Sequence, residues 1–165
     1  MRAASIKLCI LLVLPLGLFA CSRTTTPART NAPAAKVTPA AMVNDILRYV
    51  NQYRSSQGLP ALTLLPMAND IAAQHSKNMA QRKTAFGHDG FEKRAATVGK
   101  AAGPMAASAE NVAYGQLSAR EVVDGWLNSP GHRKNISGNY ALTGIGVYTD
   151  AKGVTFFTQL FFRKQ

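Results

Sequence analysis

The segment VTFFTQLFF, residues 154–162, predicts a β-strand that is apolar on both of its faces. Because successive side chains of a strand point to opposite sides, its large apolar residues divide between two faces. One face carries Phe156, Leu160 and Phe162, and the other carries Phe157 and Phe161. A strand of this kind needs cover on both sides, so its sheet must lie between two other layers.

The rest of the chain supplies a partner strand and helices. LTGIGVYT, residues 142–149, predicts a hairpin with this strand through the turn DAKG. Upstream, capping residues and apolar spacing predict helices over about residues 39–57, 67–82 and 118–128. We therefore predict an α+β fold in which helical layers enclose a sheet.

The segment from Phe86 to Tyr114 lacks such periodicity. It is rich in glycine and alanine, and we expect irregular chain there with at most a short helix near residues 91–98. Two side chains with functional chemistry are instead expected in the core. His75 lies on an apolar helical face, where a hydrogen-bonded core histidine is commoner than a ligand. Trp126 falls in the buried stripe of the 118–128 helix.

The N-terminal residues predict an export signal. Residues 1–20 carry Arg2 and Lys7 followed by an uncharged apolar run, which is too short to span a bilayer as a helix. The sequence LFAC then resembles a bacterial lipobox, in which the chain is cut before the cysteine and Cys21 is acylated. A plain signal peptide with a chance cysteine is the alternative.

We expect three parts in the chain: a lipoprotein signal over residues 1–20, the lipidated Cys21 with a flexible Thr/Pro/Ala-rich tether over residues 21–38, and a folded domain over residues 39–165. Acylation by more than one chain would anchor the protein stably to a membrane of the cell envelope. Ser22 is not the acidic residue that retains some Gram-negative lipoproteins at the inner membrane. We therefore expect the outer membrane, with the domain facing the periplasm or the surface.

Charge restricts the partners. The chain has 19 basic and 8 acidic side chains, a formal charge of +11, and loss of Arg2 and Lys7 with the signal lowers it to +9. On an exported protein, this charge favours anionic lipid or acidic cell-wall ligands. The alternative is a solvated basic surface that only aids solubility. The basic residues are scattered and accompany no nucleic-acid-binding motif, so nucleic acid is not an expected partner. We expect a monomer.

Three residues are candidates for a functional site: His88 in FGHDGFEKR, Glu110 in AENVAYG and His132 in SPGHRKN. Each is expected in a loop or at the boundary of an element, where side chains can converge. Two imidazoles and one carboxylate are a reasonable zinc ligand set with an open position for water. Their separation of 22 residues each way matches no local metal motif, so three unrelated surface residues remain the alternative.

These segments resemble a known family. AAQHSKNMA, FGHDGFEKR, AENVAYG, EVVDGWLNSPGHRKNI, TGIGVY and FFTQLF occur in the order and at roughly the spacing of the bacterial branch of the CAP superfamily. These SCP-like domains are named for cysteine-rich secretory proteins, antigen 5 and pathogenesis-related 1 proteins. The resemblance implies a three-layer α-β-α sandwich with a central, mainly antiparallel sheet.

The resemblance also implies a polar cleft. By position, its histidines are His88 and His132, and its acid is Glu110, followed by Asn111. In some members the two histidines bind zinc or another divalent cation. Eukaryotic members place a second cleft carboxylate three residues after the tryptophan, and this chain has Ser129 there.

We favour a non-catalytic binding module that holds a lipid, a cell-wall fragment or a partner protein at the His/Glu cleft. The cofactor stays open between none and zinc or another divalent cation held by His88 and His132. A metal-dependent hydrolase is one alternative, in which Glu110 acts as general base or a bound cation activates water. The other is a structural envelope protein whose histidines only join loops together.

Overall fold

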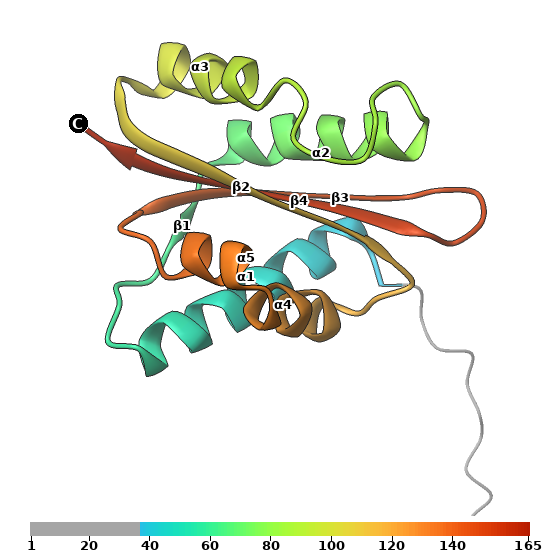
Figure 1. The fold of residues 1–165 in the computed structure, drawn as a ribbon, viewed down its shortest axis with the longest axis horizontal. Coiled ribbons are helices and arrows are strands. Elements are labelled where there is room, and N and C mark those ends of the chain that lie inside the picture. The colour runs from blue at the N-terminus through green and yellow to red at the C-terminus, as the bar shows by residue number, and fades with distance from the viewer. Residues whose placement is uncertain (1–36) are drawn as a thin grey trace, which may run out of the picture. The chain divides into compact units, whose positions relative to one another are not determined.

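The structure, a computed structural model, describes residues 37–165 (Figure 1). The predictions for the signal, for Cys21 and for nearly all of the tether lie outside the described residues. No helix in the described range is both long enough and apolar enough to cross a membrane.

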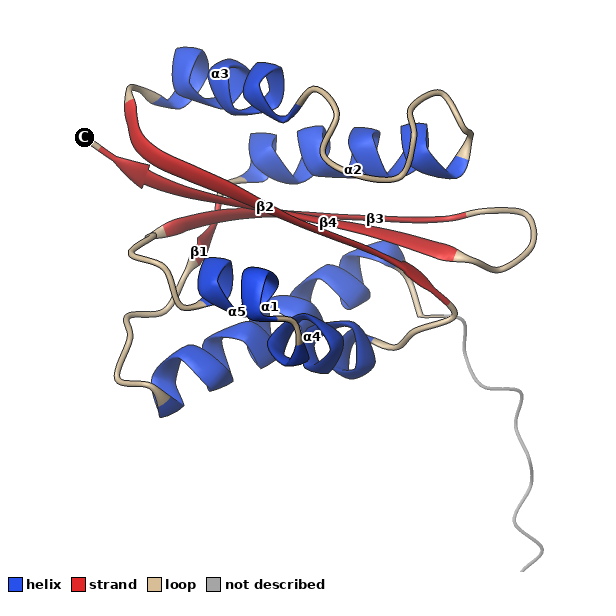
Figure 2. Ribbon diagram, in the orientation of Figure 1, coloured by secondary structure: helices blue, strands red, loops and turns tan. Residues whose placement is uncertain are grey.

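Residues 37–165 form five helices and four strands. In chain order they are α1 (Pro39–Ser56), β1 (Thr63–Leu64), α2 (Pro66–Ala80), α3 (Phe91–Ala102), β2 (Met105–Gly115), α4 (Ala119–Asn128), α5 (Pro130–Ile136), β3 (Leu142–Thr149) and β4 (Thr155–Lys164). The strand order is β1-β3-β4-β2, in which β1 pairs with β3 in parallel and the other pairs are antiparallel. Helices α2 and α3 cover one face of the sheet, and α1, α4 and α5 cover the other (Figures 1 and 2). The predicted three-layer sandwich with a mainly antiparallel sheet is confirmed.

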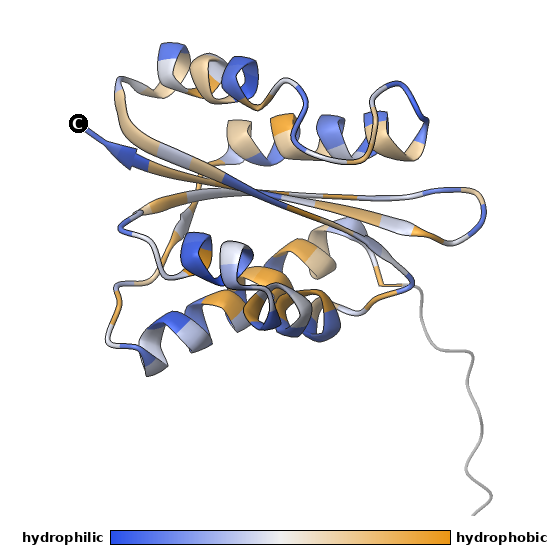
Figure 3. Cartoon of the chain, in the orientation of Figure 1, coloured by the Kyte–Doolittle hydropathy of each residue, from blue (hydrophilic) through white to orange (hydrophobic). Residues whose placement is uncertain are grey.

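Strand β4 is buried on both faces, as its sequence predicts. Phe157 and Phe161 belong to the hydrophobic cluster beneath α1 and α4, whereas Leu160 and Phe162 belong to the cluster beneath α2 and α3. All four side chains are fully buried. Burial of each stabilises the fold by about 1.5–3 kcal/mol. Figure 3 shows that hydrophilic residues mark the C-terminal end of β4, where it leaves the helical layers.

Local signals set the bounds of the helices. The Thr38 hydroxyl accepts from the Ala41 N–H at 3.2 Å at the start of α1, and Gly58 adopts a left-handed conformation just after its end. Ser118 and Glu121 form a capping box at the start of α4.

Glycine allows α2 to lie directly on β3. A Cβ atom at Gly146 would overlap the backbone nitrogen of Ala73, and one at Gly144 would overlap the backbone of Ala68. The two glycines therefore let the helix backbone approach the strand more closely than any side chain would permit.

The prediction of irregular chain over residues 86–114 was wrong at its C-terminal end. Residues 105–115 form strand β2, and α3 is four residues longer than the short helix expected. The sequence of β2, MAASAENVAYG, has few β-branched or aromatic residues, so its local preference for strand is weak. Pairing with β4 from Met105↔Lys164 to Gly115↔Thr155 imposes the extended conformation instead.

Candidate functional site

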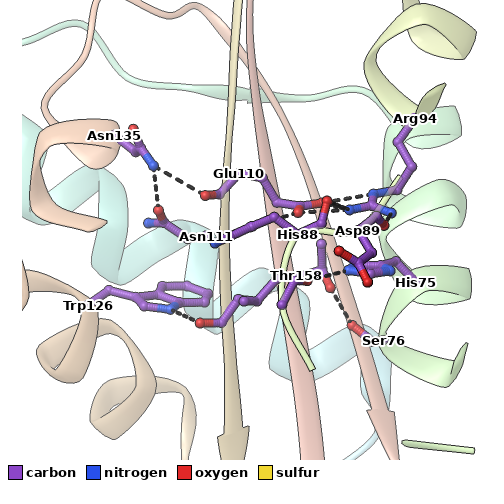
Figure 4. A network of polar contacts seen from close by, with 12 residues as sticks. His75, Ser76, His88, Asp89, Arg94, Glu110, Asn111, Trp126, Asn135 and Thr158 are labelled. Atoms are coloured by element: carbon purple, nitrogen blue, oxygen red, sulfur yellow. Dashed lines mark hydrogen bonds and ion pairs between the residues drawn. The ribbon is translucent and has the colours of Figure 1, made fainter. Parts of the chain in front are cut away.

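Glu110 and Asn111 lie in the middle of β2, not in a loop as expected. Because side chains alternate along a strand, the two neighbours point to opposite faces of the sheet. The Glu110 side chain points toward α3 and the loop before it, whereas Asn111 points toward α4 and α5 (Figure 4). A Glu-Asn pair in a strand therefore connects both helical layers to the same point of the sheet.

Arg94 holds the Glu110 carboxylate. Its Nε and Nη2 atoms donate to Oε2 and Oε1 of Glu110 at 2.8 Å each, and the Nδ1–H of His88 donates to Oε1 at 2.9 Å. The Glu110 side chain is 1% exposed, that of Arg94 is 12% exposed and that of His88 is 53% exposed. The two-pronged pair supplies the neutralising charge that a buried carboxylate requires.

The same arginine fixes the loop that carries His88. Arg94 Nη1 donates to the Asp89 carbonyl at 2.8 Å, and Nη2 lies 3.4 Å from the His88 carbonyl. From α2, the Nε2–H of His75 donates to the Gly87 carbonyl at 2.9 Å. The loop is thus held from two helices, and the predicted loop position of His88 is confirmed.

His75 is a core residue, as predicted. It is 2% exposed, and its hydrogen bond to Gly87 satisfies the ring nitrogen that faces the loop. Burial lowers the pKa of His75, and the positive charge of Arg94 acts in the same direction, while the hydrogen bond to Gly87 opposes them. A neutral imidazole with a fixed tautomer suits a structural role at this point.

On the opposite face of the sheet, two asparagines join β2 to α5. Asn135 Nδ2 donates to Asn111 Oδ1 at 2.8 Å and to the Glu110 carbonyl at 3.2 Å. Asn111 Nδ2 donates to the His132 carbonyl at 3.2 Å, and Asn111 is fully buried. The Glu-Asn pair therefore positions the backbone of His132 as well as the ring of His88.

His132 is the third residue of the short helix α5, not a loop residue. The chain turns at Ser129, which ends α4, and Pro130 starts the new helix. His132 is partly buried. Burial lowers the pKa of His132, and the positive charge of His88 acts in the same direction.

Helix α5 is also held from α1 by Arg54, which is 1% exposed. Its guanidinium donates to the carbonyls of Pro60, Ile136, Gly138 and Tyr140 at 2.7 to 3.1 Å. Burial lowers the pKa of Arg54. This residue was not singled out from the sequence, because an arginine near the end of an amphipathic helix resembles many solvated ones.

Trp126 is a core residue, as predicted. It is 1% exposed, and its Nε1–H donates to the Val112 carbonyl of β2 at 3.3 Å. The ring therefore braces the strand beside the site and offers no surface on which a ligand could stack.

The candidate residues do not fit a three-ligand zinc site as they are arranged. Among residues 37–165, no three histidine, cysteine or acidic side chains are grouped so that they could hold a metal ion. Both oxygens of Glu110 are used by Arg94, and one of them also accepts from His88. Only His88 and His132 could offer nitrogen ligands, and a metal held by this pair stays a prediction.

Arg94 is the functional residue that sequence reasoning missed. The available signal was its position one turn into the helix that follows His88. A basic residue there is ordinarily solvated, and its partner lies 16 residues away on a different element. Only the fold brings the two charges together.

Solved structures share this fold. An extracellular protein containing an SCP domain from Bacillus anthracis aligns with a TM-score of 0.66 and 30% identity, over 76% of this chain and 41% of that one. An outer surface protein from Borrelia burgdorferi aligns with a TM-score of 0.62 and 18% identity, over 74% of this chain and 92% of that one.

Curated relatives agree with the fold comparison. Bacillus subtilis protein YkwD is 29% identical over 148 residues, which cover 84% of this chain and 54% of YkwD. Bacillus subtilis membrane protein YlbC is 32% identical over 72% of this chain and 34% of YlbC. The chain thus spans about half or less of the length of these relatives. The model of the cysteine-rich secretory protein family, CAP, matches residues 47–161, so the chain belongs to the CAP family.

Proposed function

We propose that this CAP-family chain is a non-catalytic envelope protein that binds an anionic group at the site around His88 and His132. The ligand is a phosphate or carboxylate of an envelope lipid or wall polymer. Acylated Cys21 anchors the chain to the outer membrane, and the tether gives the domain reach. The basic sequence, with a charge of +9 after removal of the signal, supports an anionic ligand.

The ion pair between Arg94 and Glu110 is the observation that carries this proposal. A general base or metal ligand needs an oxygen lone pair that can reach the proton or ion. In Glu110 both oxygens accept from Arg94, and the side chain is almost fully buried. The carboxylate therefore anchors the His88 loop, and the imidazoles remain as the accessible groups.

Those imidazoles suit an anion. Because the Nδ1–H of His88 donates to Glu110, its Nε2 is the ring atom that is left for a ligand. Arg133 and Lys134 are exposed on α5 beside His132 and add positive charge at this side. The charge of Arg94 is already neutralised by Glu110, so the histidines and the α5 cations are the groups that an anion would meet.

The hydrolase alternative has less support. To act as a base, Glu110 would have to give up a two-pronged ion pair in a buried position, which is costly. The purely structural alternative differs from our proposal in its prediction for His132, since it expects replacement of this residue to change stability and no binding.

The locations given for two similar proteins support an envelope location for this chain. The Bacillus anthracis structure is described as extracellular, and the Borrelia burgdorferi protein as an outer surface protein.

Labelling of the full chain with radioactive palmitate tests the lipid anchor at Cys21. Label should enter the wild type and not the Cys21→Ser variant, and label in both would remove Cys21 from the account.

Titration calorimetry of the full chain in a zwitterionic detergent tests the binding. Glycerol phosphate is the first probe, since this group occurs in lipid headgroups and in acidic wall polymers. Soluble dihexanoylphosphatidylglycerol and poly(glycerol phosphate) then distinguish the two sources. We expect binding that falls at least tenfold in the double variant His88→Ala, His132→Ala and little in Lys100→Gln, an exposed charge on α3. Equal binding by the double variant and the wild type would refute the site.

A further inference from the structure

A hollow lies at the far end of the loop that carries His88. It has a volume of about 700 Å³ and is formed by the end of α2, the end of β2 and the β3–β4 hairpin. Its walls include Arg82, Phe86, Tyr114, Lys152 and Phe156. Neither His88 nor Glu110 lines it, so it is separate from the site described above.

Aromatic rings form one wall of this hollow. Phe86 meets Tyr114 edge to face with ring centroids 4.8 Å apart, and Tyr114 stacks on Phe156 at 5.6 Å. Phe86 is 48% exposed and Tyr114 is 57% exposed. Because α2 ends at Ala80, it leaves this part of the sheet uncovered. Exposed aromatic rings beside polar groups indicate a binding surface, and the C–H face of a sugar ring packs well on such rings.

Arg82 lines this hollow from a backbone conformation that is unfavourable for a residue other than glycine. The Arg82 N–H donates to the Met79 carbonyl and the Lys83 N–H to the Asn78 carbonyl, which together form a Schellman motif at the end of α2. The motif places Arg82 at φ +56°, and it is the one residue other than glycine with positive φ among residues 37–165. Glycine is the usual residue at this position because it avoids the steric cost of a Cβ atom. An arginine there suggests that its side chain has a use.

The charges of the hollow favour an anion. Within the described part of the chain, neither Arg82 nor Lys152 takes part in an ion pair. The one acidic residue of the wall, Asp150, is occupied by the hairpin turn, where its Oδ1 accepts from the N–H groups of Lys152 and Val154. Two unpaired cations thus stand beside an aromatic wall.

We infer that this hollow binds a carboxylate-bearing sugar of an envelope glycan. The ring packs on Tyr114 and Phe86, and Arg82 and Lys152 bind the carboxylate. That the protein meets such glycans rests on the envelope location in the proposed function, but the site uses none of the same side chains. The rings line a hollow and pack on one another, which suits an inserted ring better than a flat bilayer surface.

The test compares variants of the full chain in a zwitterionic detergent. The probe is the disaccharide N-acetylglucosaminyl-N-acetylmuramic acid, and its neutral counterpart is di-N-acetylchitobiose. We expect Arg82→Gly to weaken binding of the acidic disaccharide at least tenfold, since a charge-assisted hydrogen bond is lost. The same variant should melt at the same or a higher temperature, because glycine relieves the strain. Loss of binding with no loss of stability cannot be attributed to misfolding.

Lys83→Gln is the matched control, because it removes the same charge from the next residue, which does not line the hollow. It should bind within about twofold of the wild type, and Tyr114→Ala should bind weakly. The double variant His88→Ala, His132→Ala should keep this binding, which separates the inference from the proposed function. Absence of binding by the wild type, equal affinity for the neutral disaccharide, or Arg82-dependent binding of dihexanoylphosphatidylglycerol alone would each overturn the inference.

Discussion

Arg94 of α3 and Glu110 of β2 form a buried two-pronged ion pair, with Nε and Nη2 donating to the two carboxylate oxygens at 2.8 Å each. The same guanidinium binds the Asp89 carbonyl in the His88 loop. One side chain therefore joins α3, the loop and the sheet at a single point. The position of His88 depends on this pair, and so does the role that Glu110 can play.

Removal of one partner should be costly. Arg94→Ala leaves Glu110 buried without its cation, and we expect the free energy of unfolding to fall by about 3–5 kcal/mol in urea denaturation. The double variant Arg94→Ala, Glu110→Gln no longer contains the uncompensated charge and should recover part of that loss. If the loss of stability in the double variant equalled the sum of the losses in the two single variants, the two residues would not be coupled.

Acidification should destabilise the fold through His75. Because the pKa of His75 is lowered in the folded chain, the unfolded chain takes up the proton first as pH falls below the ordinary value of 6.5. Stability is therefore lost as pH falls from about 6.5 toward the folded pKa, and is fully present above 6.5. His132 contributes with the same sign.

Urea midpoints measured between pH 5 and pH 8 check this. His75→Gln keeps a donor for the Gly87 carbonyl but cannot titrate, so its stability should depend less on pH than that of the wild type. Identical slopes in the two proteins would exclude His75 as the cause.

The contact between α2 and β3 should tolerate no added carbon. Gly146→Ala forces a Cβ into the backbone of Ala73, and we expect a loss of about 3 kcal/mol or more. Gly125→Ala is the control, since it lies within α4 and has nothing within 4 Å of its added Cβ. It should gain about 1 kcal/mol from helix propensity. Similar thermal shifts for both variants would argue against the close approach.

Asn111 should control the environment of His132. Asn111→Ala removes the hydrogen bonds to Asn135 and to the His132 carbonyl, and should cost about 1–3 kcal/mol. As α5 loosens, the burial that depresses the pKa of His132 decreases, so this pKa should rise toward its ordinary value in an NMR titration. Asn128→Ala, at an exposed position at the end of α4, should leave the pKa of His132 unchanged.

Much of the fold follows from strong local patterns. The two apolar faces of VTFFTQLFF require layers on both sides, and Thr38 and Ser118 mark helix starts that the structure confirms. Strand β2 could not be predicted, since its alanine-rich sequence becomes extended only by pairing with β4. Local pattern therefore specifies the elements whose burial is encoded in their own side chains.

The site likewise contains residues that the sequence predicts and residues that it does not. His88, Glu110 and His132 were found because imidazoles and carboxylates beside glycine and proline stand out in a sequence. Arg94 was not found, because its partner is on another element and a helical arginine is ordinarily solvated. The contact between the rings of Phe86 and Tyr114 could not be predicted either, because the two residues meet only where the loop lies along β2.

The most direct test of the proposed binding site uses the imidazole signals of the full chain. The chain contains three histidines, so its imidazole NMR spectrum separates the two site residues from buried His75, which serves as an internal control. During titration with glycerol phosphate, the signals of His88 and His132 should shift together with one saturation curve, while that of His75 stays in place. Unchanged signals from both His88 and His132 at saturation would contradict the proposed binding site.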